Sequence, residues 1–405
     1  MVNVERGRVF QLEQNERKPV RVNSKRDSGC GSRRRGGTES EPIYELAKAH
    51  VMERLNGTCR DAVARVEGRG ACKERRPFFL KTHKTGGSSV QNVVFRRGWI
   101  RGWDVLMPPE GSYLGHPRSF VREMVDGDLR KVFGRFDAFA SHARLNVPEF
   151  KAVVREDAVW FTILREPTQL FVSLFEYYNL QKWIKETLES LLNMDLEEMK
   201  RKTSRENRST RHGRNQMAFD LGLSPEYFDN ASAVDAFVRE LNSTFDLILI
   251  MERFSESLVL LRRALCWSVH DMIAFPMNQL LKGKPKPKVT EKLTVLNRAD
   301  FQIYHTFHSK FNEAVLALGD EMQDELEALS CATEAWREEC GLQRIKGTDL
   351  IRPVRPYGQT WGYSVSPKHH ESEEICYLFA TSELPFLKLL HARQTIRATK
   401  AGLSQ

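Results

Sequence analysis

FFLKTHKTGGSSVQNVV, residues 78–94, is the most informative stretch of this 405-residue chain. Its first three residues are apolar and predict a short buried strand, and its valines recur at the spacing of the inner face of a helix. A basic loop with two glycines joins the two. Glycines let backbone N–H groups approach an anion, the helix N-terminus adds unpaired donors, and a lysine adds charge. The order of strand, loop and helix therefore predicts an anion-binding loop.

This loop is not a Walker A motif, because Lys84 precedes Gly86 and Gly87 and the G-x-x-x-x-G-K-[ST] order is absent. Taken alone, such a stretch is equally typical of a plain connection between a strand and a helix. The hypothesis of a ligand site therefore needs a second motif.

The fold class follows from the way apolar runs and helical patterns alternate along the chain. Short strands alternating with helices indicate an α/β domain with a central, largely parallel sheet flanked by helices. Residues 98–117 are rich in glycine, proline and aromatic residues and predict an irregular surface excursion. Buried strands are predicted at 136–140, 158–164 and 247–251, and helices at 256–265 and 301–329, the last with Asp300 as its N-cap.

The charge of the chain is unevenly distributed and suggests three regions. The net charge is +9, and residues 1–40 hold ten Lys/Arg and five Asp/Glu. The folded part is therefore only mildly basic, which suits small anions but not nucleic acid, whose binding needs a dense basic face. We expect a basic, disordered tail and linker over 1–76 (a helix or stalk at 41–55, the linker at 56–76), a folded domain over 77–390 and a C-terminal tail over 391–405.

We expect no membrane-spanning or secretory segment in this sequence. No run approaches the roughly 18 apolar residues of a transmembrane helix, and the first residues lack the apolar core of a signal peptide. The spacing of the seven cysteines fits no zinc-binding pattern and does not indicate whether the protein lies in an oxidising or a reducing compartment. Four N-x-[ST] sequons favour a secreted or lumenal setting, at Asn56, Asn207, Asn230 and Asn242.

A second motif, REPTQLFVSLFEYY at 165–178, follows the predicted strand at 158–164. Arg165 stands at the carboxyl end of that strand, where α/β sheets bind ligands. Ser173 lies eight residues later, about two turns into the next helix. A guanidinium and a hydroxyl on rigid elements can hold one phosphate together. The alternative is that Arg165 pairs with Glu166 and the serine lies on a helix surface, but the upstream loop favours the phosphate site.

Together the two motifs resemble the donor site of sulfotransferases that use 3′-phosphoadenosine 5′-phosphosulfate (PAPS). The resemblance implies that Lys84, Thr85, Gly86, Gly87, Ser88 and Ser89 bind the 5′-phosphosulfate, and that Arg165 and Ser173 bind the 3′-phosphate. More narrowly, the chain is similar to the galactose-3-O-sulfotransferase family, in these motifs and in segments 214–223, 256–267 and 362–364. This resemblance covers about residues 77–390. It implies a P-loop-like, three-layer sulfotransferase fold, with PAPS as donor and no metal.

For function, the resemblance implies transfer of a sulfuryl group to the 3-hydroxyl of a terminal β-galactose on a glycolipid, such as galactosylceramide, or on a glycan. It also implies a Golgi glycoprotein of the type II membrane class, although the N-terminal anchor of that family is not visible here. Residues 195–214 are highly charged and lie where the acceptor region is expected. The identity of the acceptor therefore stays open between lipid-linked and glycan-linked galactose.

Sulfuryl transfer, like phosphoryl transfer, is an in-line displacement that depends on positioning and charge stabilisation. Lys84 is expected to stabilise the transferred group. A general base is also needed, and two histidines are candidates: His83 inside the loop and His142 after the predicted strand at 136–140. Lys81 is either a second phosphate contact or a solvent-facing residue. On resemblance alone, the acceptor contacts are Tyr177, Arg214 and Asn215.

Three alternatives remain at this point. The chain could act on another carbohydrate hydroxyl. A phosphate-loop kinase is disfavoured because the loop order is wrong and Arg165 stands where such enzymes often place a metal-binding aspartate. A non-enzymatic anion-binding module would depend on the arginine-rich tail and weaken steeply with salt.

Overall fold

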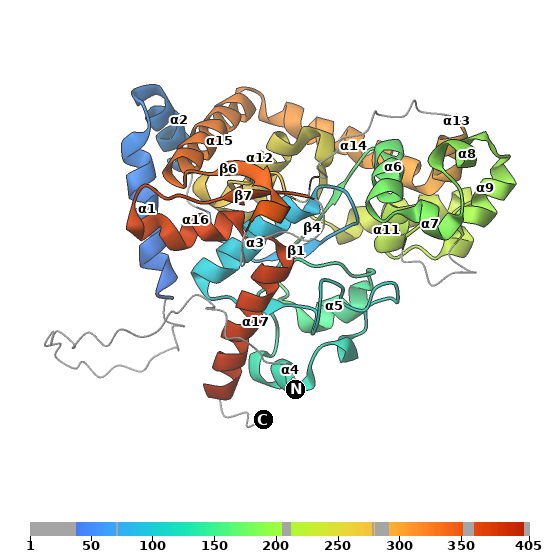
Figure 1. Cartoon of the computed structure of the whole chain (residues 1–405), viewed down its shortest axis with the longest axis horizontal. Coiled ribbons are helices and arrows are strands. Elements are labelled where there is room, and N and C mark those ends of the chain that lie inside the picture. The colour runs from blue at the N-terminus through green and yellow to red at the C-terminus, as the bar shows by residue number, and fades with distance from the viewer. Residues whose placement is uncertain are drawn as a thin grey trace, which may run out of the picture.

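The computed structural model describes residues 38–69, 72–204, 212–277, 279, 291–350 and 360–400. Its centre is a five-stranded parallel sheet in the order β2-β3-β1-β4-β5 (Figure 1), and β6 and β7 form a second, antiparallel sheet. The strands are β1 Pro77–Leu80, β2 Val105–Leu106, β3 Ala138–Phe139, β4 Val159–Leu164, β5 Leu247–Ile250, β6 Gln343–Lys346 and β7 Trp361–Ser364. The predicted α/β class with a parallel central sheet is confirmed.

Strand β1 occupies the middle of the sheet, between β3 and β4, with Phe79 in register with Phe161 of β4. Every residue of β1 and β4 is buried. A parallel strand covered by helices on both faces must be apolar throughout, which explains the uninterrupted apolar runs in the sequence. The loop that follows β1 therefore starts from a rigid base.

Helices surround the sheet, with α1, α2 and α15 at one end of the molecule and α7 to α9 at the other (Figure 1). Helices α16 and α17 pack against α3, and α14 packs against β5. The bounds are α1 Ser40–Arg54, α2 Gly57–Glu67, α3 Gly87–Arg101, α4 Gly127–Phe133, α5 Val147–Val153, α6 Pro167–Tyr177, α7 Leu180–Ile184, α8 Leu188–Asn193, α9 Leu196–Thr203, α10 Gln216–Asp220, α11 Ala231–Thr244, α12 Phe254–Leu265, α13 Glu291–Leu296, α14 Arg298–Leu318, α15 Asp320–Glu339, α16 Glu373–Ala380 and α17 Glu383–Lys400.

The long helix predicted over 301–329 is two helices, α14 and α15, separated by Gly319. This glycine has φ +50°, a left-handed conformation that favours residues without a Cβ, so the chain turns there. Asp300 lies inside the first turn of α14 and is not its N-cap. Its carboxylate instead accepts hydrogen bonds from the backbone N–H groups of Met217 and Ala218 at the start of α10.

The linker predicted over 56–76 is also wrong in part, because helix α2 lies within it. Ala62, Val63 and Val66 of α2 are buried, and the helix packs against α15. Three small apolar residues in a charged segment are a weak sequence signal, which explains the error. Likewise, part of the predicted C-terminal tail is the end of α17, which continues to Lys400.

Disulfide bonds join distant parts of the chain. Three bonds form, between Cys59 and Cys331, Cys72 and Cys266, and Cys340 and Cys376. The seventh cysteine, Cys30, lies outside the described residues. Disulfides of this kind persist in oxidising compartments, so the structure adds information on compartment that cysteine spacing did not provide.

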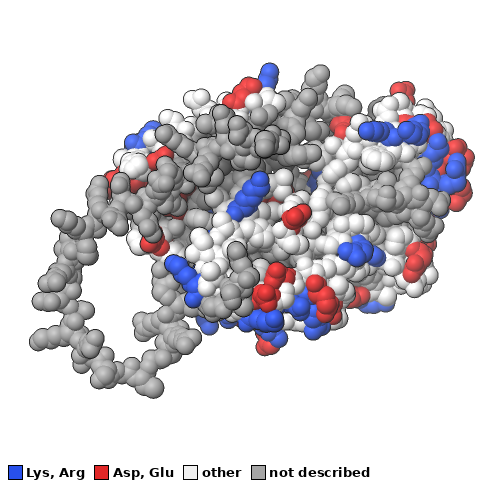
Figure 2. All heavy atoms as spheres, turned by 60° about the horizontal axis from the view of Figure 1, so that its bottom comes forward, with Lys and Arg blue, Asp and Glu red and all other residues white. Residues whose placement is uncertain are grey.

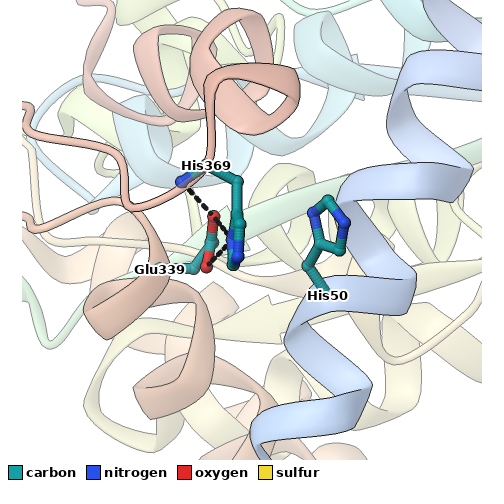
Figure 3. Close-up of side chains that lie close together, drawn as sticks. All are labelled: His50, Glu339 and His369. Carbon is teal, nitrogen blue, oxygen red and sulfur yellow. Dashed lines mark hydrogen bonds and ion pairs between the residues drawn. The ribbon is translucent and has the colours of Figure 1, made fainter.

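A cluster of polar side chains gives a further link between α1 and the C-terminal part of the chain (Figure 3). The buried carboxylate of Glu339 accepts hydrogen bonds from the backbone N–H and Nδ1 of His369, at 3.2 and 2.9 Å, and lies 3.2 Å from Nε of Arg54. The ring of His50 lies 4.2 Å from that of His369. These residue types can bind metals, but the carboxylate is already neutralised by protein donors, so the cluster fastens α1 to the segment before α16.

The described surface carries charges of both signs. On the face shown in Figure 2, basic and acidic side chains lie side by side among neutral ones. Within the described ranges, no helix combines the length and the apolar character that crossing a bilayer requires.

Candidate active site

The predicted order of strand, loop and helix is confirmed for residues 77–101. Strand β1 ends at Leu80 and helix α3 begins at Gly87, directly after Gly86, which has φ +82°. Residues with a Cβ rarely adopt this φ, so the backbone favours glycine at position 86, where a Cβ would also meet the flexible end of the Met251 side chain just after β5. The first N–H groups of α3 precede the regular hydrogen-bond pattern of the helix, and that of Ser89 donates to the carbonyl oxygen of Gly86. The loop thus presents backbone donors and the positive end of a helix at the carboxyl edge of the sheet.

Lys84 lies in this loop in a conformation that non-glycine residues seldom adopt, with φ +58°. Its ammonium lies over the ring of Tyr177, 3.4 Å from the centroid. Burial, and then the positive charges of Arg165 and Lys81, lower the pKa of Lys84 to about 7. The loop therefore holds a lysine whose charged form has no carboxylate partner within ion-pair distance among the described residues.

Arg165 follows β4 and donates a hydrogen bond from Nη1 to the carbonyl oxygen of Lys84, at 2.9 Å. Burial lowers its pKa, although Glu252 and Glu166 oppose that shift. The Glu166 carboxylate accepts from the N–H groups of Thr168 and Gln169 and so caps α6. Ser173 lies half-buried two turns along this helix. Arg165 thus contacts the loop, and helix α6, which carries Ser173, begins two residues after Arg165.

Both candidate bases lie beside the loop. The rings of His83 and His142 stack with centroids 4.2 Å apart. Nδ1 of His142 lies 2.8 Å from the carbonyl oxygen of Lys81, and burial, then His83 and Lys81, lower the pKa of His142 well below its ordinary value. Nδ1 of His83 lies 2.8 Å from Oδ2 of Asp220. His142, which is neutral, therefore stacks on His83, which is paired with the carboxylate of Asp220.

Several residues around His83 escaped the sequence analysis. Residues 98–117 were expected to be a surface excursion, but α3 extends to Arg101, and His116 is buried with its ring 4.7 Å from that of His83. Tyr113, His212 and Tyr178 also face His83, at centroid distances of 5.6, 4.7 and 6.1 Å. The sequence did contain a signal for Asp220, because this residue lies in segment 214–223, which resembles the galactose-3-O-sulfotransferase family. His116 and Tyr113 had only the weak signal of a glycine-rich loop.

Other predicted donor contacts have protein partners. The ammonium of Lys81 is buried and lies 2.7 Å from Glu383 and 2.9 Å from Gln91, so it does not face solvent. The Ser89 hydroxyl donates to the carbonyl of Phe275, and the Thr85 hydroxyl lies 2.9 Å from that of Thr82. In this structure these three side chains therefore bind protein groups.

Two residues predicted to contact the acceptor form side-chain interactions within the protein instead. Asn215 is fully buried, and its side chain donates to the carbonyl of Leu296 and accepts from the N–H of Asp300. Its side-chain donor and acceptor are thus engaged within the fold, and its predicted contact with a sugar stays a prediction. Arg214 forms a bidentate pair with Asp229, with both distances 2.9 Å. Tyr177, in contrast, lies directly beneath Lys84.

Cationic groups gathered at a helix N-terminus, next to a histidine–carboxylate pair, suit an enzyme that transfers a group from an anionic donor. A parallel α/β sheet with the site at the carboxyl edge of its strands is the architecture of such enzymes. The fold and the site thus define the class as an α/β group-transfer enzyme.

Comparison with known proteins is more specific. A model of the galactose-3-O-sulfotransferase family matches residues 39–394, which includes α1 and α2. The galactosylceramide sulfotransferase of Mus musculus is 30% identical over 345 residues, 80% of this chain and 80% of its own length. The galactose-3-O-sulfotransferase 2 of Sus scrofa is 30% identical over 339 residues, 78% and 83% of the two chains. This chain belongs to the galactose-3-O-sulfotransferase family.

Proposed function

We propose that this protein transfers the sulfuryl group of PAPS to the 3-hydroxyl of a terminal β-galactose on a glycolipid or glycan. Family membership supports the reaction, and the names of the relatives include both a galactosylceramide sulfotransferase and galactose-3-O-sulfotransferases. The observation that carries the proposal is the contact between Lys84 and Arg165. The positive charge of Arg165 also helps to lower the pKa of Lys84, and an anion bound beside both residues would offset this repulsion.

The donor would lie across the loop. Backbone N–H groups at the start of α3 bind the 5′-phosphate, together with Ser88, and Lys84 stabilises the negative charge on the sulfuryl and bridging oxygens. Arg165 and Ser173 bind the 3′-phosphate, which distinguishes PAPS from ATP. The residues that are present fit an anionic nucleotide, because the loop has backbone donors and a lysine without a carboxylate partner within ion-pair distance in the described residues.

The acceptor hydroxyl loses its proton as the new O–S bond forms. His83 is the stronger candidate for the base, since the carboxylate of Asp220 stabilises its protonated form. His142, whose pKa is lowered by burial, stays neutral and contributes a hydrogen bond or a packing surface. Nε2 of His83 is covered in this structure, so the acceptor hydroxyl reaches it only when a neighbouring ring moves aside.

The setting proposed is the lumen of the Golgi apparatus, with the protein as a membrane-associated glycoprotein. Three disulfide bonds suit an oxidising compartment. The sequons at Asn56, Asn230 and Asn242 lie on exposed residues, where a glycan can be attached.

Two measurements test the proposal. Calorimetric titration with adenosine 3′,5′-bisphosphate, beside 5′-AMP and ATP, should show clear preference for the bisphosphate. Incubation with PAPS and either galactosylceramide or a β-galactosyl oligosaccharide should then yield a product sulfated at the galactose 3-hydroxyl, located by NMR. Equal affinity for the three nucleotides, or sulfation at another hydroxyl, would overturn the donor or the acceptor assignment respectively.

A further inference from the structure

Asp220 is the last residue of the short helix α10, and its side chain is fully buried. Its carboxylate is surrounded by donors from three segments of the chain. Oδ2 accepts from the backbone N–H of His83 and lies next to Nδ1 of the same residue, both at 2.8 Å. Oδ1 lies 3.1 Å from Nε2 of His116 and accepts from the amide of Gln216 at 2.8 Å. Both of these contacts of Oδ2 are thus to His83, whereas the contacts of Oδ1 hold the Asp220 side chain in its orientation.

This arrangement determines the protonation of the His83 ring. A carboxylate oxygen can only accept, so the proton of the neutral imidazole must reside on Nδ1. Nε2 then carries a lone pair, and among the described residues it has no hydrogen-bond partner. Because Oδ2 holds both the backbone and the ring of His83, the ring cannot turn away without losing one of these bonds. The base is therefore oriented before any substrate arrives.

The charge of Asp220 is as important as its geometry. Burial alone would raise its pKa, but the interaction with His83 and the hydrogen bonds from His116 and His83 outweigh burial and hold the pKa well below its usual range. The carboxylate is thus ionised. When His83 accepts a proton it becomes a buried cation in a loop that already contains Lys84 and lies near Lys81. A negative charge at 2.8 Å offsets that cost.

We infer that Asp220 is the positioning residue of the reaction, with His116 holding it in place; this inference rests on the proposed function. The acceptor hydroxyl gives its proton to Nε2 of His83 while its oxygen bonds to sulfur. The bond from sulfur to the 5′-phosphate oxygen breaks, and its electron pair leaves with adenosine 3′,5′-bisphosphate. Asp220 takes no proton in this step. It holds Nδ1 protonated and stabilises the imidazolium, as the buried aspartate does in serine hydrolases.

The test is a double-mutant cycle on the full chain, with Asp220→Asn, His83→Ala and the combined variant. Asp220→Asn should lower kcat by about 10²–10⁴-fold, the contribution of a general base, and leave the affinity for adenosine 3′,5′-bisphosphate unchanged. In the His83→Ala background the same substitution should cost almost nothing, because Asp220 acts through His83. Asp61→Asn, on the exposed face of α2, is the matched control and should behave as the unaltered protein.

His116→Phe is a milder variant for the case in which Asp220→Asn fails to fold. It keeps an aromatic ring but removes one donor to the carboxylate, and it should lower kcat by about tenfold while it spares donor affinity, again only when His83 is present. Additive losses, or a parallel loss of bisphosphate affinity, would reduce Asp220 to a structural role and overturn the inference. Full activity of His83→Ala would overturn the choice of base. Absence of any sulfated product from the unaltered protein would instead overturn the proposed function.

Discussion

The Arg165 guanidinium donates a hydrogen bond to the carbonyl oxygen of Lys84, and the backbone of Lys84 is left-handed at that point. The two residues belong to the two separate motifs that the sequence analysis assigned to opposite ends of the donor. In the structure they are in contact, so the residue proposed for the 3′-phosphate also braces the loop proposed for the 5′-phosphosulfate. Their effects on donor binding and on transfer are therefore coupled.

The first prediction concerns Arg165→Ala. We expect the affinity for adenosine 3′,5′-bisphosphate to fall by about 10–150-fold, since hydrogen bonds to charged groups contribute about 1.5–3 kcal/mol. We also expect kcat to fall, because Lys84 loses the donor to its carbonyl. Ser173→Ala is the comparison: it should lower affinity by about fivefold and spare kcat. Titration and steady-state kinetics measure both quantities, and an unchanged kcat in Arg165→Ala would contradict the bracing role.

The second prediction concerns Lys84→Met, which should lower kcat by about 10²–10³-fold, as the loss of one charge-stabilising group does in other enzymes. The folded chain should become more stable. The lowered pKa means that between pH 7 and 10.5 the native state binds fewer protons than the unfolded state, so the free energy of unfolding rises with pH there. At and below pH 7 the full cost of burying the charge is present.

Melting temperatures at pH 6, 7 and 9 test that second effect. The gain in Tm from Lys84→Met should be largest at pH 6 and 7 and shrink towards pH 9. Lys388→Met, at an exposed position of α17, is the control for the effect of the substitution itself. A gain that is the same at every pH would mean that titration of Lys84 does not contribute.

The third prediction is proton uptake when the donor binds. A bisphosphate beside Lys84 favours its charged form and raises its pKa from about 7. At pH 8 the free lysine is mostly neutral, so binding should take up about one proton. Titrations in two buffers with different ionisation enthalpies, such as Tris and HEPES, give this number directly. The uptake should disappear in Lys84→Met, and its persistence there would assign the proton to another group.

The fourth prediction asks whether buried Lys81 is a structural partner of Glu383 or a phosphate contact. If the buried pair with Glu383 is structural, Glu383→Ala should destabilise the fold by about 3 kcal/mol, because it leaves an unpaired buried charge. The combined variant Lys81→Met/Glu383→Leu should recover most of that loss in urea unfolding. Bisphosphate affinity should stay unchanged in the combined variant. A large loss of affinity would show that Lys81 contacts the phosphate after all.

The parts of the site that could be predicted from sequence are those encoded within single stretches. The loop around Lys84 and the strand end at Arg165 each place their chemistry beside an apolar run, so position in the sheet follows from local pattern. Asp220 and His83 are 137 residues apart, and no local pattern connects them. Asp300 illustrates the same limit: a carboxylate at the start of one helix caps another that is close only in space. Secondary structure is a local property, whereas hydrogen-bond partners are chosen by the tertiary fold.

The disulfide bonds determine when, during synthesis, the fold can be completed. Cys59 and Cys72 leave the ribosome early, but their partners follow 272 and 194 residues later. Until then the two thiols are close neighbours in the chain and free to pair with each other. Correct pairing therefore depends on delayed oxidation or on thiol–disulfide exchange. Helix α2, in a segment that the sequence predicted as a linker, can therefore form its disulfide bond to Cys331 only once that residue, in the last third of the chain, has been synthesised.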